Sequence, residues 1–319
     1  MNILLKNIKQ LIGITENSDA IKRGKAQGEV TKLDNAYLVV RNHRIESFGP
    51  MSECPETGLD EHDCTGRLLM PMYVDSHTHM IFAESRSGEM NQRLHGKSYQ
   101  EIAEAGGGIL NSAAKLRAMS EQQLYDDAQE RIGNAIKQGS GAFEIKSGYG
   151  LTIEDEMKML RVARILKQLS PTPIKTTFLG AHALPAEFKD NKDVYMHLVT
   201  NEMLPRIAGE GLADYIDIFC ETGYFSLDDL KQVIEAGDKH GLKAKVHVNQ
   251  FSTFGAVKMA CEMGALSVDH LEVMNDEDYA ALANSNTIAT GLPLCSLFLD
   301  IPYTPGRQLI DKNIPLAIA

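Results

Sequence analysis

The stretch Pro71-Met-Tyr-Val-Asp-Ser-His-Thr-His-Met-Ile-Phe82 is a short strand-like run that ends in a His-x-His pair. Side chains two positions apart on a strand point to the same face, so His77 and His79 converge on one point. Two converging imidazoles are a common beginning of a zinc or iron site, and Asp75 is placed to orient the strand or a ring. His-x-His alone is a weak motif, because a surface loop can also hold such a pair. The choice between a metal site and a loop depends on where the other polar residues fall.

From Pro71 onward, apolar runs alternate with amphipathic stretches that have apolar residues at spacings of three and four, a pattern that predicts alternating strands and helices. The predicted strands cover residues 73–79, 142–147, 174–180, 215–221, 244–248, 266–271, 287–291 and 314–319. The predicted helices cover residues 120–137, 152–169, 193–208, 226–240, 252–263 and 276–283. Apolar strands separated by helices are typical of a parallel sheet buried on both faces.

Eight such strand-helix units predict an α/β fold, a (β/α)8 barrel of the TIM type. The active site of such a barrel lies at the carboxyl ends of its strands. A doubly wound sheet is the alternative, but it would carry a glycine fingerprint at its first strand-helix turn, which the sequence lacks.

Residues 1–70 have a different pattern, with few helical signals. The apolar runs Asn2–Ile14 and Ala36–Phe48 read as strands, and the second ends at the turn signal Gly49-Pro50. We therefore expect a small β-sandwich domain over residues 1–70 and the barrel over residues 71–319, ending within strand eight. The carboxyl-terminal part of the small domain is expected to be absent from the sequence.

Charge and cysteine content narrow the possible partners. The net charge of −11 and the isoelectric point near 5.4 leave no basic footprint for nucleic acid or an anionic membrane. The sequence has no apolar segment of about 18 residues that would span a membrane. Its five cysteines are scattered without a Cys-x-x-Cys pair, which indicates reduced thiols. These features predict a cytoplasmic protein that acts on a small molecule.

The barrel prediction can be tested against the positions of the polar residues. Many of them fall at the carboxyl ends of predicted strands: Tyr149, His182, Glu221, His247, Gln250, Asp269, His270 and Glu272. Five of the ten histidines lie at such ends, namely His77, His79, His182, His247 and His270. This grouping favours a metal site over scattered core or surface histidines.

With these residues in place, the sequence resembles the amidohydrolase superfamily and, within it, the imidazolonepropionase family. The resemblance runs through most of residues 65–319. It is carried by Val74-Asp-Ser-His-Thr-His79, Arg86 with Arg93, Ser98-Tyr-Gln-Glu-Ile-Ala103, Gly106-Gly-Gly-Ile109, Glu144-Ile-Lys-Ser-Gly-Tyr-Gly150, Thr177-Phe-Leu-Gly-Ala-His182, Val246-His-Val-Asn-Gln250 and Ser267-Val-Asp-His-Leu-Glu272. It implies hydrolysis of the lactam C–N bond of 4-imidazolone-5-propanoate to N-formimidoyl-L-glutamate by a metal-bound hydroxide. It also implies one zinc or iron ion per subunit and a homodimer.

The resemblance implies metal ligands at His77, His79 and His247, together with an Asp at the end of strand eight. That Asp is expected a few residues beyond Ala319, so the sequence is either a truncated form or lacks one ligand. Superfamily members with two metals bridge them with a lysine of strand four. Residues 215–221 contain no lysine, which favours a single metal.

The resemblance also implies catalytic roles for two further histidines. His270 would hydrogen-bond the metal-bound water or the oxyanion and help move its proton, although a buried histidine that supports Asp269 is the alternative. His182 would hydrogen-bond the ring carbonyl or the developing oxyanion. The sequence leaves the general base open.

Substrate binding is expected from four residues. Arg86, with Tyr99 as a second donor, would hold the propionate carboxylate, although Arg86 has an alternative in a surface ion pair with Glu84 or Glu89. Tyr149 would donate to the same end of the substrate or to the ring. Gln250 would contact the imidazolone nitrogens.

Two other functions remain open on the sequence. One is another mononuclear amidohydrolase, such as a nucleobase deaminase. The other is an inactive, truncated barrel that only binds a ligand. Arg86 favours the imidazolone reading over a deaminase, because a guanidinium in the site suits an anionic substrate.

Overall fold

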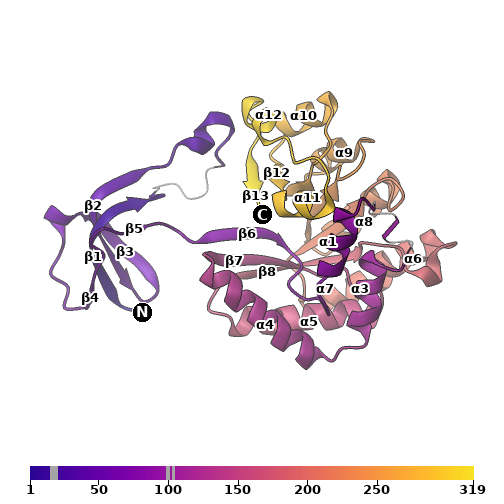
Figure 1. The fold of residues 1–319 in the computed structure, drawn as a ribbon, viewed down its shortest axis with the longest axis horizontal. Coiled ribbons are helices and arrows are strands. Elements are labelled where there is room, and N and C mark those ends of the chain that lie inside the picture. The colour runs from indigo at the N-terminus through magenta and orange to yellow at the C-terminus, as the bar shows by residue number, and fades with distance from the viewer. Residues whose placement is uncertain (15–20, 98–100, 103–104) are drawn as a thin grey trace. The chain divides into compact units, whose positions relative to one another are not determined.

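The computed structural model covers residues 1–319 and describes all of them except residues 15–20, 98–100 and 103–104. The chain divides into two compact units, Met1–Met72 and Tyr73–Ala319. Figure 1 shows the strands of the first unit and the strand-helix alternation of the second.

The first unit is a five-stranded sheet with the order β3-β2-β1-β4, in which β5 also pairs with β1. Its elements are β1 (Ile3–Ile12), η1 (Gly24–Gly28), β2 (Lys32–Arg41), β3 (Arg44–Pro50), η2 (Met51–Glu53), β4 (Asp60–Asp63) and β5 (Leu68–Leu69). The apolar run Ala36–Phe48 spans parts of two antiparallel strands and not one. Asn42 and His43 turn the chain between them with φ of 52° and 63°, the left-handed conformation that tight hairpins require.

The second unit is built on eight parallel strands, and the predicted barrel fold is confirmed. The strands are β6 (Tyr73–Thr78), β7 (Ser140–Lys146), β8 (Ile174–Ala181), β9 (Tyr215–Cys220), β10 (Lys243–Val248), β11 (Ser267–His270), β12 (Ile288–Gly291) and β13 (Leu316–Ile318). Each strand is hydrogen-bonded to the next in chain order, and the last strand, β13, comes close to the first, β6. The carboxyl ends of all eight strands therefore meet at one end of the barrel.

The helices of this unit include all six that the periodicity predicts. They are α1 (Ser87–Leu94), α3 (Gly108–Arg117), α4 (Glu121–Lys137), α5 (Ile153–Leu169), η3 (Ala186–Phe188), α6 (Lys192–Leu198), η4 (Val199–Met203), α7 (Leu204–Gly209), α8 (Leu227–Lys239), α9 (Ala256–Glu262), α10 (Asp276–Ala283), α11 (Pro293–Leu299) and α12 (Gly306–Asp311). Helix α4 begins with a complete capping box, in which Ser120 and Gln123 satisfy each other's backbone N–H groups. The helices α1, α3, α11 and α12 were not predicted.

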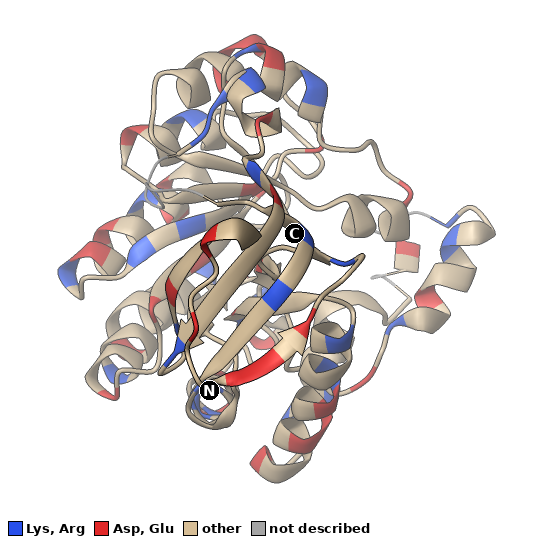
Figure 2. Cartoon of the chain, turned by 90° about the vertical axis from the view of Figure 1, so that its left-hand side faces the viewer, with Lys and Arg blue, Asp and Glu red and all other residues tan. Residues whose placement is uncertain are grey.

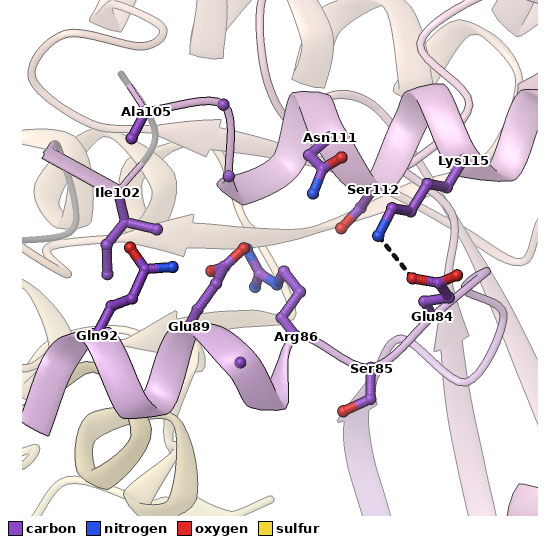
Figure 3. A pocket seen from close by; sticks show the side chains of 13 residues that line it. Glu84, Ser85, Arg86, Glu89, Gln92, Ile102, Ala105, Asn111, Ser112 and Lys115 are labelled. Carbon is purple, nitrogen blue, oxygen red and sulfur yellow. Dashed lines mark hydrogen bonds and ion pairs between the residues drawn. The ribbon is translucent and has the colours of Figure 1, made fainter.

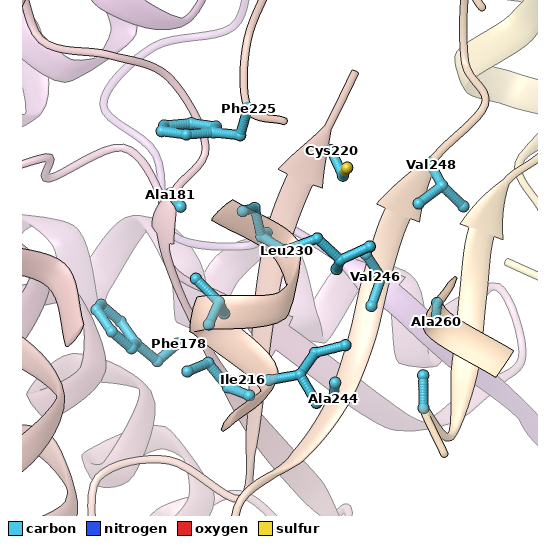
Figure 4. Packing of buried hydrophobic residues seen from close by; sticks show 14 of the residues in the cluster. Phe178, Ala181, Ile216, Cys220, Phe225, Leu230, Ala244, Val246, Val248 and Ala260 are labelled. Carbon is cyan, nitrogen blue, oxygen red and sulfur yellow. The ribbon is translucent and has the colours of Figure 1, made fainter. Parts of the chain in front are cut away.

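Alternate residues of each barrel strand pack outward against the helices. On β10, Ala244, Val246 and Val248 belong to the large core cluster, which also contains Ile216 of β9 and Leu230 of α8 (Figure 4). Burial of each valine, isoleucine or leucine side chain in this cluster stabilises the fold by about 1.5–3 kcal/mol. This packing fixes the strands and, with them, the side chains that point the other way.

The inward positions of the same strands are charged. Glu144 and Lys146 alternate with the apolar residues of β7, as Asp217 does on β9 and Lys245 and His247 do on β10, and all five side chains are buried. A barrel of this type usually fills its interior with branched apolar side chains. Charges in that position indicate that the interior supports a site and does not serve as an ordinary core.

On the outside of the chain, basic and acidic residues are interspersed along the helices, as Figure 2 shows. Among the described residues, no helix is long and apolar enough to cross a membrane.

Candidate metal centre and active site

Three histidines meet at the carboxyl ends of β6 and β10. The donor atoms of His77, His79 and His247 all lie within 4.8 Å of one another. The ring centroids are 4.4 Å apart for His77 and His247, 5.7 Å for His77 and His79, and 5.8 Å for His79 and His247. The structure therefore brings together the three predicted ligands into a group that can hold a metal ion.

Two of these imidazoles are fixed by buried carboxylates. His77 Nδ1 lies 2.7 Å from Asp269 Oδ2, and His247 Nδ1 lies 2.8 Å from Asp217 Oδ2. An ionised carboxylate can only accept, so each Nδ1 carries the proton and donates it, which leaves Nε2 of both rings as a free donor toward a metal. Burial holds the pKa of both histidines well below the ordinary value, so both are neutral near pH 7.

The third imidazole provides a direct test of whether a metal fits. His79 Nδ1 is buried, and no described residue gives it a hydrogen bond. A buried polar atom without a partner is expensive, and a metal ion would satisfy it. Three neutral imidazoles with this geometry suit zinc or iron chemically.

A cluster of buried charges supports the histidines from inside the barrel. Lys146 Nζ lies 2.7 Å from Glu144 Oε1, 2.8 Å from Asp217 Oδ2 and 3.6 Å from Asp269 Oδ2. Lys245 Nζ lies 3.1 Å from the other oxygen of Glu144. The ammonium groups of Lys146 and Lys245 thus compensate most of the negative charge of the three buried carboxylates, which water does not solvate there.

The charges of this cluster shift one another's pKa. Burial would lower the pKa of Lys146, but Asp217, Glu144 and Asp269 raise it above its ordinary value. Burial would likewise raise the pKa of Asp269, but Lys245, Lys146 and the hydrogen bond from His77 hold it well below the usual range. Both groups therefore stay ionised at neutral pH, as the orientation of His77 requires.

Sequence reasoning did not find Glu144, Lys146, Asp217 or Lys245 as part of the site. The available signal was their spacing, because charged residues occupy alternate positions on strands that are otherwise apolar. That spacing places Glu144 with Lys146, and Lys245 with His247, on the inner face of the barrel.

A cavity of about 620 Å³ opens over the histidines and has the size of a small-molecule site. It is lined by every predicted site residue that the structure describes: His77, His79, Arg86, Tyr149, His182, His247, Gln250 and His270. The predicted Tyr99 lies outside the described residues. Phe82, Ile109, Phe219 and Phe298 supply apolar walls.

Arg86 stands between this cavity and a smaller one of about 260 Å³, whose lining is shown in Figure 3. Its Nη1 lies 3.8 Å from Glu89 Oε2, so the ion pair with Glu89 is present. Glu84 is paired with Lys115 instead, at 2.6 Å. The guanidinium is therefore both anchored by a carboxylate and presented to the large cavity.

Tyr149 lies in a turn that Glu156 holds in place. The Glu156 carboxylate accepts hydrogen bonds from the backbone N–H groups of Gly148, Gly150 and Leu151 at 2.8–3.1 Å. A Cβ atom on Gly150 would lie 2.4 Å from the backbone nitrogen of Glu156, so only glycine fits there. The turn is fixed, and with it the position of the Tyr149 ring in the cavity wall.

His182 has one tautomer imposed by its neighbour. Its Nδ1 lies 3.0 Å from the carbonyl oxygen of Gly148, which can only accept, so Nδ1 donates. Burial lowers the pKa of His182 to about 4. The ring is therefore neutral near pH 7, and Nε2 is a hydrogen-bond acceptor.

His270 has the opposite character. Its Nδ1 lies 3.4 Å from Glu272 Oε1, and its φ is +87°, in the left-handed region. Burial would lower the pKa of His270, but contacts with Cys295 and Glu272 raise it to about 10, so the ring is protonated near pH 7. Asp269 instead hydrogen-bonds His77 and Ser267, and His270 lines the cavity beside Glu272.

No family model matches the chain. Solved structures share its fold at low sequence identity. The triazine hydrolase from Arthobacter aurescens superposes with a TM-score of 0.72 and 12% identity, over the whole of this chain and 71% of that one. The guanine deaminase from C. acetobutylicum superposes with a TM-score of 0.67 and 15% identity, over the whole of this chain and 74% of that one.

The barrel and its three-histidine site define the class of the amidohydrolases. Comparison with curated proteins indicates which amidohydrolase family the chain belongs to. The imidazolonepropionase of Christiangramia forsetii is 49% identical over the whole of this chain and 78% of its own length, and that of Geobacillus kaustophilus is 35% identical over 99% of this chain and 76% of its own. The chain belongs to the imidazolonepropionase family.

Proposed function

We propose that the chain hydrolyses the lactam C–N bond of 4-imidazolone-5-propanoate and releases N-formimidoyl-L-glutamate. The observation that carries this proposal is the pairing, in one cavity, of the three-histidine group with the guanidinium of Arg86. The first suits activation of water at a cyclic amide, and the second suits a substrate with a carboxylate. Family membership supports the same reaction.

We propose that His77, His79 and His247 hold one zinc or iron ion. When bound, this ion would lower the pKa of a coordinated water and polarise the lactam carbonyl. The protein contributes the fixed tautomers of His77 and His247, which Asp269 and Asp217 impose, and the buried ammonium groups of Lys146 and Lys245, which keep the Asp269 carboxylate ionised.

Arg86 would bind the propionate carboxylate, with Tyr99 as a second donor. The ion pair with Glu89 helps to hold the guanidinium in place at the cavity wall, where it can meet an anionic group of the substrate. By holding the propionate, Arg86 would position the lactam carbonyl carbon, which lies at the other end of the substrate, for attack by water.

The substrate ring would lie among Tyr149, His182 and Gln250. Neutral His182 presents Nε2 as an acceptor, so we place an N–H of the substrate ring there, in place of the ring carbonyl or the developing oxyanion expected from the sequence. The Gln250 amide can donate and accept, which suits the remaining ring nitrogen. The hydroxyl of Tyr149 would donate to the ring or to the propionate.

Protonated His270 would stabilise the oxyanion that forms when water adds to the lactam carbonyl. Its cationic ring is a hydrogen-bond donor held against Glu272, and such donors are strongest in an enclosed cavity. When the C–N bond breaks, the carbonyl carbon becomes a carboxylate and the leaving nitrogen takes a proton. His270 is placed to supply that proton.

A substrate panel tests this function. The metal-reconstituted protein should convert 4-imidazolone-5-propanoate to N-formimidoyl-L-glutamate, identified by mass, and should leave guanine and cytosine unchanged. An imidazolone without the propionate should react with a much higher KM. Deamination of a nucleobase with no turnover of the imidazolone would overturn the proposal.

A further inference from the structure

A second group of metal-binding side chains lies in the wall of the same cavity. Donor atoms of His270, Glu272 and Cys295 all lie within 4.8 Å of one another. His270 is the last residue of β11, Glu272 follows two residues later, and Cys295 comes from α11. None of the three belongs to the group of His77, His79 and His247, so the two sets of donors are separate.

Glu272 has a carboxylate oxygen that no described residue satisfies. Its side chain is fully buried, and its Oε1 lies 3.4 Å from His270 Nδ1 and 3.0 Å from Ser296 Oγ. Its other oxygen, Oε2, is buried and without a hydrogen bond from the described part of the chain. Burying such an oxygen unpaired is unfavourable, and a bound cation would remove the penalty.

Cys295 lets a metal ion reach this group from the cavity, and its sulfur determines which metal ions the group prefers. The residue is half-buried and lines the cavity, so a metal ion can reach it through the substrate entrance. Its Sγ lies 3.7 Å from Gln250 Nε2, a weak contact that a metal would replace. Sulfur, imidazole nitrogen and carboxylate oxygen together are the donors of zinc sites, and sulfur favours thiophilic ions such as zinc and cadmium.

We propose that His270, Glu272 and Cys295 form a second site for a thiophilic divalent metal ion. Binding forms a metal–sulfur bond and a metal–nitrogen bond. The thiol proton of Cys295 and one ring proton of the protonated His270 are released to solvent, because the thiolate and the neutral imidazole are the ligands. Three protein ligands leave a fourth position for water. An ion in this site also occupies His270, so we expect excess metal to inhibit hydrolysis; this last consequence rests on the proposed function.

Cadmium titration of the metal-free, reduced full chain tests the site without using activity. A thiolate bound to cadmium gives an ultraviolet sulfur-to-metal charge-transfer band, which three histidines cannot give. We expect the first equivalent to bind without this band and the second to produce it. In Cys295→Ala the band should be lost, and the second equivalent should bind at least about tenfold more weakly.

Two further variants sharpen the result. Cys261→Ala removes another partly buried thiol, from α9, and should leave the band and the affinity unchanged. Glu272→Gln keeps the thiol and should keep the band while weakening the second equivalent at least about tenfold. The proposal is overturned if the wild type gives no band, if Cys295→Ala keeps it, or if Glu272→Gln binds as tightly as the wild type. A protein that shows the band but no hydrolysis would refute the proposed function and leave the site standing.

Discussion

Lys146 and Asp217 face each other inside the barrel, with Nζ 2.8 Å from Oδ2 and both side chains fully buried. The same carboxylate oxygen lies 2.8 Å from Nδ1 of His247. One buried ammonium group thus stabilises the carboxylate that fixes the tautomer of a metal-binding histidine. Through Asp269, 3.6 Å away, it supports His77 in the same way.

Replacing Lys146 with Met should destabilise the metal-free protein by about 3–5 kcal/mol, because it leaves buried carboxylates without their cation. Urea unfolding measures the effect. Lys167→Met removes the exposed pair with Asp214 and should change stability by less than about 1 kcal/mol. A similar, small change in both variants would show that the buried cluster does not depend on Lys146.

Asp217→Asn should weaken metal binding about 10- to 100-fold, as loss of such a supporting carboxylate usually does. Asp217 Oδ1 accepts from the backbone N–H of His247 and of Ile218, while Oδ2 faces His247 Nδ1 and Lys146. The amide of an asparagine has only one oxygen, so its NH2 group must face one of these two sets of donors, and the hydrogen bonds to that set are lost. Metal titration measures the loss, with Asp214→Asn, at a half-buried carboxylate outside the site, as the control. Unchanged affinity would contradict the supporting role.

Much of this architecture could be predicted from the sequence. The eight barrel strands follow from apolar runs between helical stretches, and His-x-His at the end of β6 marks the metal group because the ends of parallel strands converge. The hairpin at Asn42 and His43 was not predicted, because apolar residues occur in both of its strands and read as one continuous run.

The charged cluster illustrates what the sequence does not show directly. Lys146 and Lys245 read as ordinary strand residues until their neighbours across the barrel are known, because the partners Asp217 and Asp269 are distant in the chain. The tautomer of His182 likewise depends on the carbonyl of Gly148, which only the fold brings within reach. Spacing along a strand identifies the inward face, but partner identity requires the three-dimensional register.

Arg86→Ala should raise KM by the loss of a charge-assisted contact of about 2–4 kcal/mol, which corresponds to roughly 30- to 1000-fold. The effect on kcat should be smaller, since the contact is made before and during the reaction. An imidazolone without the propionate should show no such dependence on Arg86. Arg206→Ala, at an exposed position, provides the control. If KM stays the same in Arg86→Ala, the carboxylate binds elsewhere.

The metal-free protein should lose stability as the pH falls from 6.5 to about 4, in part through His182. Its pKa is about 4 in the folded chain and near 6.5 when unfolded, so the unfolded state takes up the proton first. The contribution is complete above pH 6.5 and is lost progressively down to about pH 4. His182→Gln can keep the hydrogen bond to Gly148 but cannot titrate. The unfolding free energy of His182→Gln should therefore decrease less than that of the wild type as the pH falls from 6.5 to about 4. If the unfolding free energy of both proteins depends equally on pH, His182 does not have this role.

Metal content and hydrolysis, measured together in histidine variants, test most directly whether the three-histidine group holds the metal that hydrolysis requires. The measurement is best made in a Cys295→Ala background, where only the three-histidine group is expected to bind tightly. After one equivalent of zinc or iron(II) and gel filtration, the background protein and its His240→Ala control should retain the metal and hydrolyse 4-imidazolone-5-propanoate. His77→Ala and His247→Ala should lose both. Metal content near that of the background protein in either variant would contradict the assignment of these histidines as ligands, and hydrolysis that persists without metal would contradict the requirement for a metal ion.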